Sequence, residues 1–304
     1  MYPLLLDPVL KSDLWGGTAL MEKYGFASDT PTVSQAIVLS GKENSGLAVK
    51  NGRFAGQALS EVLASHADKK RVPIDIKLLH TFDRTSIKVS LCTEGPLFNS
   101  DTLLYIAECD RGAEIIYGLY RDTSITEFER IVGSNQISKI CNYVSVKRGD
   151  LFVIPSGTVY AVGKGIIALQ ISPSCAKDYR IYDYGRLDAD KKPRNLQFKA
   201  AANSICTTRT SLPFGQIGEV TLYPFGTVRE LFSCEKFGCE LLNIDGAFGA
   251  YEKDGLISLV VLNGAATISY PSGNVHISKG DSLIIPRDTR IKVTGKAEIL
   301  YTHF

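Results

Sequence analysis

The chain has 304 residues, of which 44% are hydrophobic and 22% are charged, and its formal net charge is +2 at pH 7. These values are typical of a globular protein with one large or two medium-sized domains. The charges are spread without long runs, which argues against electrostatic binding to nucleic acid. No apolar stretch approaches the roughly 20 residues that span a bilayer. Residues 1–4 also lack the basic region of a secretory signal, so we expect a cytoplasmic protein that contacts no membrane.

The N-terminal part of the chain is predicted to form short β-strands separated by Gly, Pro, Asn and Asp. One helix is expected there, over Gly56–His66, because aliphatic residues share one face of that segment. Apolar and partly alternating runs then predict strands. These strands cover Thr85–Leu91, Leu103–Glu108 and Glu114–Gly118.

The middle of the chain contains a second predicted helix. Ser124 and Glu127 form the capping-box pattern Ser-x-x-Glu, which predicts that a helix begins there. The helical pattern continues towards Ile140, with a break expected at Gly133. Two strands and a short helix follow, over Asp150–Pro155, Gly165–Ile171 and Leu196–Ser204.

The C-terminal part is again rich in β pattern. Its predicted strands cover Leu256–Leu262, Ala265–Tyr270 and Asp281–Pro286. A polar stretch that ends in turn residues, Thr207–Gly215, separates this part from the rest. We therefore expect a first domain at residues 1–210 and a second, smaller domain at residues 211–304.

A short pattern occurs twice in the chain. Val144–Pro155 and Val275–Pro286 both contain Gly-Asp, then an apolar strand, then Pro. Gly supplies the positive φ of the turn, Asp can bond the backbone nearby, and Pro ends the strand. The repeat predicts two related β-barrels. The second barrel has no cluster of metal-ligating residues, so we expect it to be structural or to contact a second subunit, and a homodimer is left open.

The cysteines argue against a disulfide framework or a cysteine zinc site. There are seven of them, an odd number, and none forms a C-x-x-C pair. We expect most of them to be small buried side chains in a reducing cytoplasm.

Several stretches resemble known families. Gly149–Tyr160 resembles the second metal motif of the cupin barrels, with Tyr160 where that motif has a His. Further stretches, in the same order, resemble short bacterial type I mannose-6-phosphate isomerases; they are Leu6–Gly17, Lys77–Leu79, Thr85–Val89, Ala113–Gly118, Pro155–Thr158 and Tyr179–Arg186. The resemblance covers nearly the whole chain. It implies a mainly β fold of two cupin-type (jelly-roll) barrels, with helical insertions in the first.

The resemblance also implies a reaction, the interconversion of mannose 6-phosphate and fructose 6-phosphate with a zinc ion held by two His and one Glu. The matching positions in this sequence are Ser90, Thr102 and Tyr160, whose hydroxyls are poor zinc ligands. No metal cofactor is therefore predicted. Loss of even an outer-shell partner costs about 10–100-fold in metal affinity or activity. We expect zinc-dependent activity to fall by several orders of magnitude.

Two cationic residues of the expected site are retained. Arg180 matches an arginine that stabilises the charged, enediolate-like oxygens in the family. Lys88 lies two residues before Ser90, on the same face of a strand. Both are predicted catalytic residues. Together with Ser90, Thr102 and Tyr160 they are predicted to bind a sugar or sugar phosphate.

A relocated metal site remains an alternative at this point. It would use Cys92, Glu94 or His80, which are near the lost positions in the sequence. Asp183 and Arg186 are instead expected to form a structural ion pair.

Two functions are consistent with these residues. The first is a mannose-6-phosphate isomerase-like protein with an altered mechanism. The second is a catalytically silent relative that binds a sugar or sugar phosphate as a sensor or partner protein. The missing ligands favour the second function, and the overall resemblance favours the first.

Overall fold

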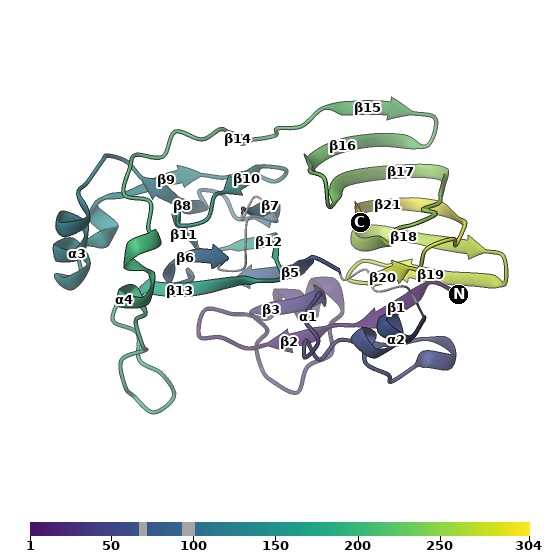
Figure 1. Ribbon diagram of the computed structural model, residues 1–304, viewed down its shortest axis with the longest axis horizontal. Helices are drawn as coiled ribbons and strands as arrows, with labels where there is room; N and C mark the ends of the chain where they lie inside the picture. Colours follow the sequence, from purple (N-terminus) through teal and green to yellow (C-terminus); the bar gives the residue numbers. More distant parts are fainter. Residues whose placement is uncertain (67–71, 93–100) are drawn as a thin grey trace.

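The computed structural model of the protein describes residues 1–66, 72–92 and 101–304. Within these residues the strands form three antiparallel sheets, here called central, outer and C-terminal (Figure 1). The central sheet contains β2 (Val9–Lys11), β3 (Gln35–Leu39), β5 (Ile74–Thr81), β7 (Thr102–Cys109), β10 (Leu151–Ile154), β12 (Ile166–Pro173) and β14 (Phe214–Gly215). The outer sheet contains β6 (Ile87–Cys92), β8 (Glu114–Leu119), β9 (Cys141–Ser145), β11 (Val159–Val162) and β13 (Ala176–Tyr182). The C-terminal sheet contains β1 (Leu4–Asp7), β4 (Ala48–Val49), β15 (Val220–Tyr223), β16 (Gly226–Ser233), β17 (Gly238–Ala250), β18 (Ile257–Tyr270), β19 (Gly273–Ser278), β20 (Ser282–Ile285) and β21 (Ile291–His303).

The central and outer sheets face each other and form the first sandwich. Apolar side chains from alternate positions of both sheets fill the space between them. They come from Leu79, Leu104, Ile106, Phe152, Ile154 and Ala168 on the central sheet and from Ile115, Tyr117, Tyr160 and Val162 on the outer sheet. The interior of this sandwich therefore has an apolar part, and any inward-facing polar residue on these strands is conspicuous.

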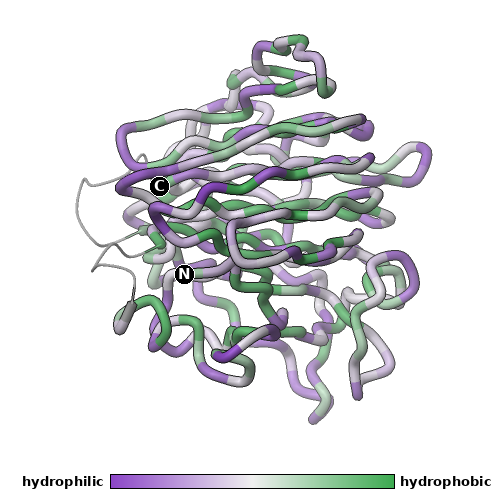
Figure 2. The backbone as a smooth tube through the Cα atoms, turned by 90° about the vertical axis from the view of Figure 1, so that its right-hand side faces the viewer, coloured by the Kyte–Doolittle hydropathy of each residue, from purple (hydrophilic) through white to green (hydrophobic). Residues whose placement is uncertain are grey.

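The opposite face of the central sheet packs against the C-terminal sheet in a second, continuous core. The chain crosses between these units more than once. The N-terminal strand β1 pairs with β20 of the C-terminal sheet, and β14 pairs with β10 of the central sheet. Figure 2 shows the strands side by side, with hydrophilic stretches at many of the turns. The domain boundary between residues 210 and 211 stays a prediction. Strands from the two sides of this boundary pair with each other.

Four α-helices are present in the described part of the chain. They are α1 (Ala19–Tyr24), α2 (Leu59–His66), α3 (Ile125–Gly133) and α4 (Phe198–Ala201), with 3-10 turns at Gly52–Phe54, Ile137–Lys139 and Ala202–Ser204. The capping prediction for α3 is confirmed, because the Glu127 amide donates to Ser124 Oγ at 3.1 Å and the helix ends at Gly133. Figure 1 shows α3 and α4 at the end of the first sandwich far from the C-terminal sheet. None of the helices described here is long and apolar enough to cross a bilayer.

The internal repeat has the same local geometry in both copies. Gly149 and Gly280 have φ angles of 89° and 96°, which a side chain would strain. Asp150 accepts from the Lys147 amide at 2.9 Å, and Asp281 accepts from the Ser278 amide at 2.8 Å. The two turns therefore close in the same way before β10 and β20.

One long strand replaces two predicted ones. Apart from Leu256, the predicted strands Leu256–Leu262 and Ala265–Tyr270 both belong to β18, whose pairing with β21 shifts register between Val261 and Asn263. Such a shift lets one strand continue across a local irregularity, so the polar Asn263-Gly264 pair does not end it.

Candidate functional site

Strand register brings most of the predicted site residues to one face of the outer sheet. On β6, Lys88 and Ser90 alternate with residues of the outer core, so both point towards the sandwich interior. Lys88 lies opposite Tyr160 on β11 and opposite Arg180 on β13. Ser90 lies opposite Asp178. Directly opposite residues in antiparallel strands point to the same side, so these five side chains share the interior face.

The three positions that were predicted to correspond to the family zinc ligands are deeply buried. Ser90, Thr102 and Tyr160 are 4%, 0% and 1% exposed. Thr102 comes from β7 of the facing sheet and shares the interior face with Leu104. Its Oγ1 has no hydrogen-bond partner within the described residues. Their role in binding a ligand stays a prediction.

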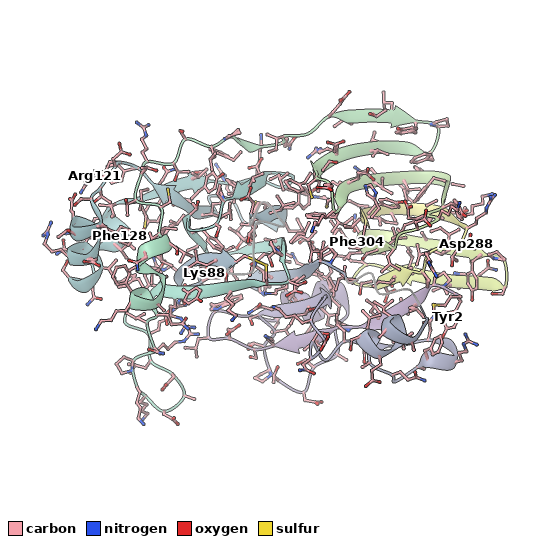
Figure 3. All side chains as sticks on the ribbon, in the orientation of Figure 1. Tyr2, Lys88, Arg121, Phe128, Asp288 and Phe304 are labelled. Carbon is pink, nitrogen blue, oxygen red and sulfur yellow. A yellow bond between two sulfur atoms is a disulfide. The ribbon has the colours of Figure 1, made fainter. Side chains whose placement is uncertain are left out.

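Lys88 forms an ion pair in this interior. Its Nζ donates to Asp178 Oδ2 at 2.6 Å and lies 4.9 Å from the centroid of the Tyr160 ring. Burial disfavours the ammonium ion, but the attraction of Asp178 outweighs that cost and raises the pKa of Lys88. Figure 3 places Lys88 in the first sandwich, far from Asp288 in the C-terminal part.

Asp178 connects Lys88 and Tyr160 through hydrogen bonds. Tyr160 donates its hydroxyl to Asp178 Oδ1 at 3.1 Å, so each carboxylate oxygen accepts one hydrogen bond. Burial would raise the pKa of Asp178, but Lys88 and Lys77 hold it below its ordinary value. Burial and the Asp178 charge both raise the pKa of Tyr160. Lys88, Asp178 and Tyr160 therefore form a cluster with one ammonium, one carboxylate and one neutral phenol at neutral pH. The Asp178 side chain is still 34% exposed, so the cluster is open to small ligands.

Lys77 adds a further cation to the interior. It lies on β5 opposite Gln170, on the face that also carries Leu79. It has no hydrogen bond or ion pair in the part of the chain that the structure describes. Burial lowers its pKa, and the charge of Asp178 partly offsets this. Sequence reasoning missed Lys77 and Asp178 as site residues. Alternation along the strands could have identified both residues, because Lys77 and Asp178 each lie two residues from an inward-facing neighbour on the same strand.

Arg180 is held at the edge of the site by polar contacts. Its Nε donates to Ser86 Oγ at 3.1 Å and its Nη1 donates to the Asn195 carbonyl at 3.1 Å. Burial and a neighbouring arginine lower its pKa. Arg180 lies opposite Lys88 in the register of β13 and β6, and its role in the site stays a prediction.

Asp183 organises the loop that supports Arg180. The predicted ion pair is confirmed, with Arg186 Nη2 at 2.5 Å from Asp183 Oδ1. Arg194 contacts the other oxygen at 3.0 Å, and Ser86 donates to Oδ1 at 2.6 Å. Since Ser86 also accepts from Arg180, this network fixes the guanidinium position.

Cys92 and His80, the two described residues proposed for a relocated metal site, do not form a metal-binding group. Cys92 forms a disulfide with Cys175, so it has no free thiolate. One disulfide is therefore present where we expected no disulfide framework and mostly buried free thiols, because β6 and the turn before β13 bring together two cysteines whose separation in sequence is 83. Glu94 lies outside the described residues. His80 is on the face of β5 opposite to Leu79, in a small pocket of about 80 Å³ with Lys23 and Glu108.

The remaining cysteines also differ from expectation. Cys141 and Cys239 are buried, Cys109 and Cys234 are half-buried, and Cys206 is exposed. Only some of the free thiols therefore behave as small core residues.

The donors of this interior do not fit a zinc ion. Positions 90, 102 and 160 carry hydroxyl groups, whereas the usual zinc ligands are imidazole, carboxylate and thiolate. Asp178 lies opposite Ser90, and both of its oxygens already accept hydrogen bonds, from Lys88 and Tyr160. The ammonium ion of Lys88 adds a repulsive charge. We derive no chemical step through a metal.

Comparison with known proteins gives the class of this fold. No family model matches the chain. The crystal structure of mannose 6-phosphate isomerase from Bacillus subtilis superposes with a TM-score of 0.88 and 27% identity over 100% of both chains. The architecture is thus that of the mannose-6-phosphate isomerases, and the prediction of a mainly β, cupin-type fold is confirmed.

Sequence relatives agree with the structural match. "Probable mannose-6-phosphate isomerase GmuF" of Bacillus subtilis is 32% identical over 67% of this chain and 68% of its own length. "Mannose-6-phosphate isomerase ManA" of the same organism is 28% identical over 99% of this chain and 98% of its own length. The chain belongs to the mannose-6-phosphate isomerase family.

Proposed function

We propose that this protein is a mannose-6-phosphate isomerase-like protein that binds a sugar phosphate in the polar part of the first sandwich and does not use the family's zinc-dependent mechanism. The expected ligands are mannose 6-phosphate and fructose 6-phosphate, the sugar phosphates of the isomerase reaction named for its relatives. Location in the cytoplasm and formation of a homodimer stay predictions.

The observation that supports this proposal is the charged cluster of Lys88, Asp178 and Tyr160, which includes one of the three positions that the family resemblance aligns with zinc ligands. Lys88 and Arg180 offer positive charge to the oxygens of a sugar or its phosphate. The partly exposed Asp178 offers carboxylate oxygens to sugar hydroxyls. These side chains can bind a sugar phosphate, and they are present even though positions 90, 102 and 160 carry hydroxyl groups.

The same cluster is poorly suited to rapid isomerisation. A Lewis-acid metal contributes several kcal/mol to the transition state, and each 1.4 kcal/mol changes the rate about tenfold. The pKa of Asp178 is lowered, which makes it a weak base, and the pKa of Lys88 is raised, which makes it a weak acid. We expect turnover of mannose 6-phosphate to be slower than ordinary enzyme rates by at least about a thousandfold.

A weak, metal-free isomerase is the second candidate function, and Arg180 favours it. Arg180 is the cross-strand neighbour of Lys88, so two cationic residues of this face could stabilise the negative charge of an enediolate. Asp178 would be the base that moves a proton between C1 and C2. This activity would persist in the presence of a chelator.

Two measurements test the proposal. Isothermal titration with mannose 6-phosphate and fructose 6-phosphate is expected to show binding that Arg180→Gln weakens by about tenfold or more and that the exposed control Arg290→Gln leaves unchanged. A coupled assay for fructose 6-phosphate, with and without chelator, measures turnover. Binding without turnover supports a sugar-phosphate-binding protein that lacks isomerase activity. Slow turnover that persists with chelator supports the weak, metal-free isomerase. Turnover at roughly 1–1000 per second that chelator abolishes would contradict both.

A further inference from the structure

Lys88 differs from an ordinary surface lysine in its surroundings. Its side chain is only 17% exposed, and it lies on the same strand face as Ser90, one of the family's ligand positions. Its cross-strand neighbour is Tyr160, a second ligand position. A metal ion held by side chains at positions 90 and 160 would therefore lie beside the Lys88 ammonium.

We propose that Lys88 is a built-in cation that keeps divalent metal ions out of this site. It acts in two ways. Its positive charge repels a metal ion in an interior where charges are weakly screened. Its Nζ also donates to Asp178 Oδ2 at 2.6 Å, so this carboxylate, which lies opposite Ser90, is engaged and less available to a metal.

The exclusion of metal ions by Lys88 is an effect separate from the absence of metal-ligating side chains at positions 90, 102 and 160. If the hydroxyls at positions 90 and 160 were the whole cause, restoring histidines there would restore metal binding. With Lys88 in place, the histidines would meet a fixed positive charge and an occupied carboxylate. With Lys88 neutralised, two histidines and Asp178 would supply the three protein ligands of a common zinc site. The inference concerns metal ions alone and holds whether or not the natural ligand is a sugar phosphate.

The test compares two variants of the full chain. The first carries Ser90→His and Tyr160→His and keeps Lys88. The second adds Lys88→Met, which keeps the length of the side chain and removes its charge. Zinc affinity is measured by titration in a zinc buffer of known free concentration, and folding is checked by circular dichroism and thermal melting. We expect the second variant to bind zinc about 100-fold or more tightly than the first.

Controls separate the effect of Lys88 from a general change of charge. Lys177 lies on β13 opposite Leu91, is exposed, and faces away from the interior. Lys177→Met in the two-histidine background is expected to change zinc affinity by less than about threefold. A second pair with Ser90→His and Thr102→Glu, with and without Lys88→Met, repeats the comparison while Tyr160 stays in place. Misfolding of one pair therefore leaves the other to decide.

The outcomes are distinct. Tighter binding only after Lys88→Met supports the inference. Equal zinc affinity with and without Lys88 would overturn it, because the lysine would not be the barrier. Absence of zinc binding in all folded variants would overturn it as well, since removal of the cation would then not open the site.

Discussion

The disulfide between Cys92 and Cys175 leads to a quantitative prediction about stability. It joins the end of β6 to the turn before β13 across a sequence separation of 83 residues. In the chain-entropy model, closing a loop of this length lowers the entropy of the unfolded chain enough to stabilise the native state by about 4.5 kcal/mol. We therefore expect Cys175→Ser to lower the free energy of unfolding by roughly 3–4.5 kcal/mol, allowing for residual structure in the unfolded chain.

Equilibrium unfolding in urea measures this change. The oxidised native protein and Cys175→Ser are compared without reductant, and the native protein is measured again with reductant. The reduced native protein is expected to behave like Cys175→Ser. Cys206→Ser is the matched control, because Cys206 is an exposed free cysteine and its replacement is expected to change stability by less than about 0.5 kcal/mol.

Two results would refute this reasoning. One is the titration of all seven thiols in the denatured, unreduced protein, which would mean that the bond does not form. The other is a loss below about 1 kcal/mol in Cys175→Ser when the bond is present in the parent protein, which would mean that loop closure contributes little here.

Three further predictions concern the helices and the charged cluster. Ser124→Ala removes the cap of α3 and is expected to cost about 1 kcal/mol of unfolding free energy in urea, whereas a neutral result would contradict the capping assignment. Phe128 is 0% exposed, so Phe128→Ala is expected to cost about 3–5 kcal/mol in the same assay, and a loss under 1 kcal/mol would contradict its place in the core. The folded-state pKa of Asp178 is lowered, so its charge stabilises the protein above the ordinary carboxyl value of 3.8 and this stability is lost as the pH falls. Asp178→Asn is therefore expected to be less stable than the native protein at pH 7, and thermal melting should show the gap narrowing below about pH 4. A gap that stays constant with pH would contradict the ion pair with Lys88.

Much of the local structure could be predicted from the residues alone. The capping box of α3 depends on two residues three positions apart, and the Gly-Asp turns before β10 and β20 depend on adjacent residues. Their geometry is set by backbone sterics and short hydrogen bonds, which need no distant partner. Alternation along β6 likewise places Lys88 and Ser90 on one face of the strand, because this period is a property of the extended backbone.

The tertiary structure decided which residues meet across strands. Asp178 becomes the partner of Lys88 only because β13 pairs with β6 in one register, and a slip of one residue would turn it to the other face. The pairing of Cys92 with Cys175, and of β1 with β20, likewise joins segments far apart in the chain. His80 faces away from the sandwich interior because it follows Leu79, whose side chain packs inside. The amino-acid sequence by itself determined the strands, the turns and the hydroxyl-bearing residues at positions 90, 102 and 160. Long-range register, which depends on the packing of whole sheets, decided that an ion pair is at the centre of this site.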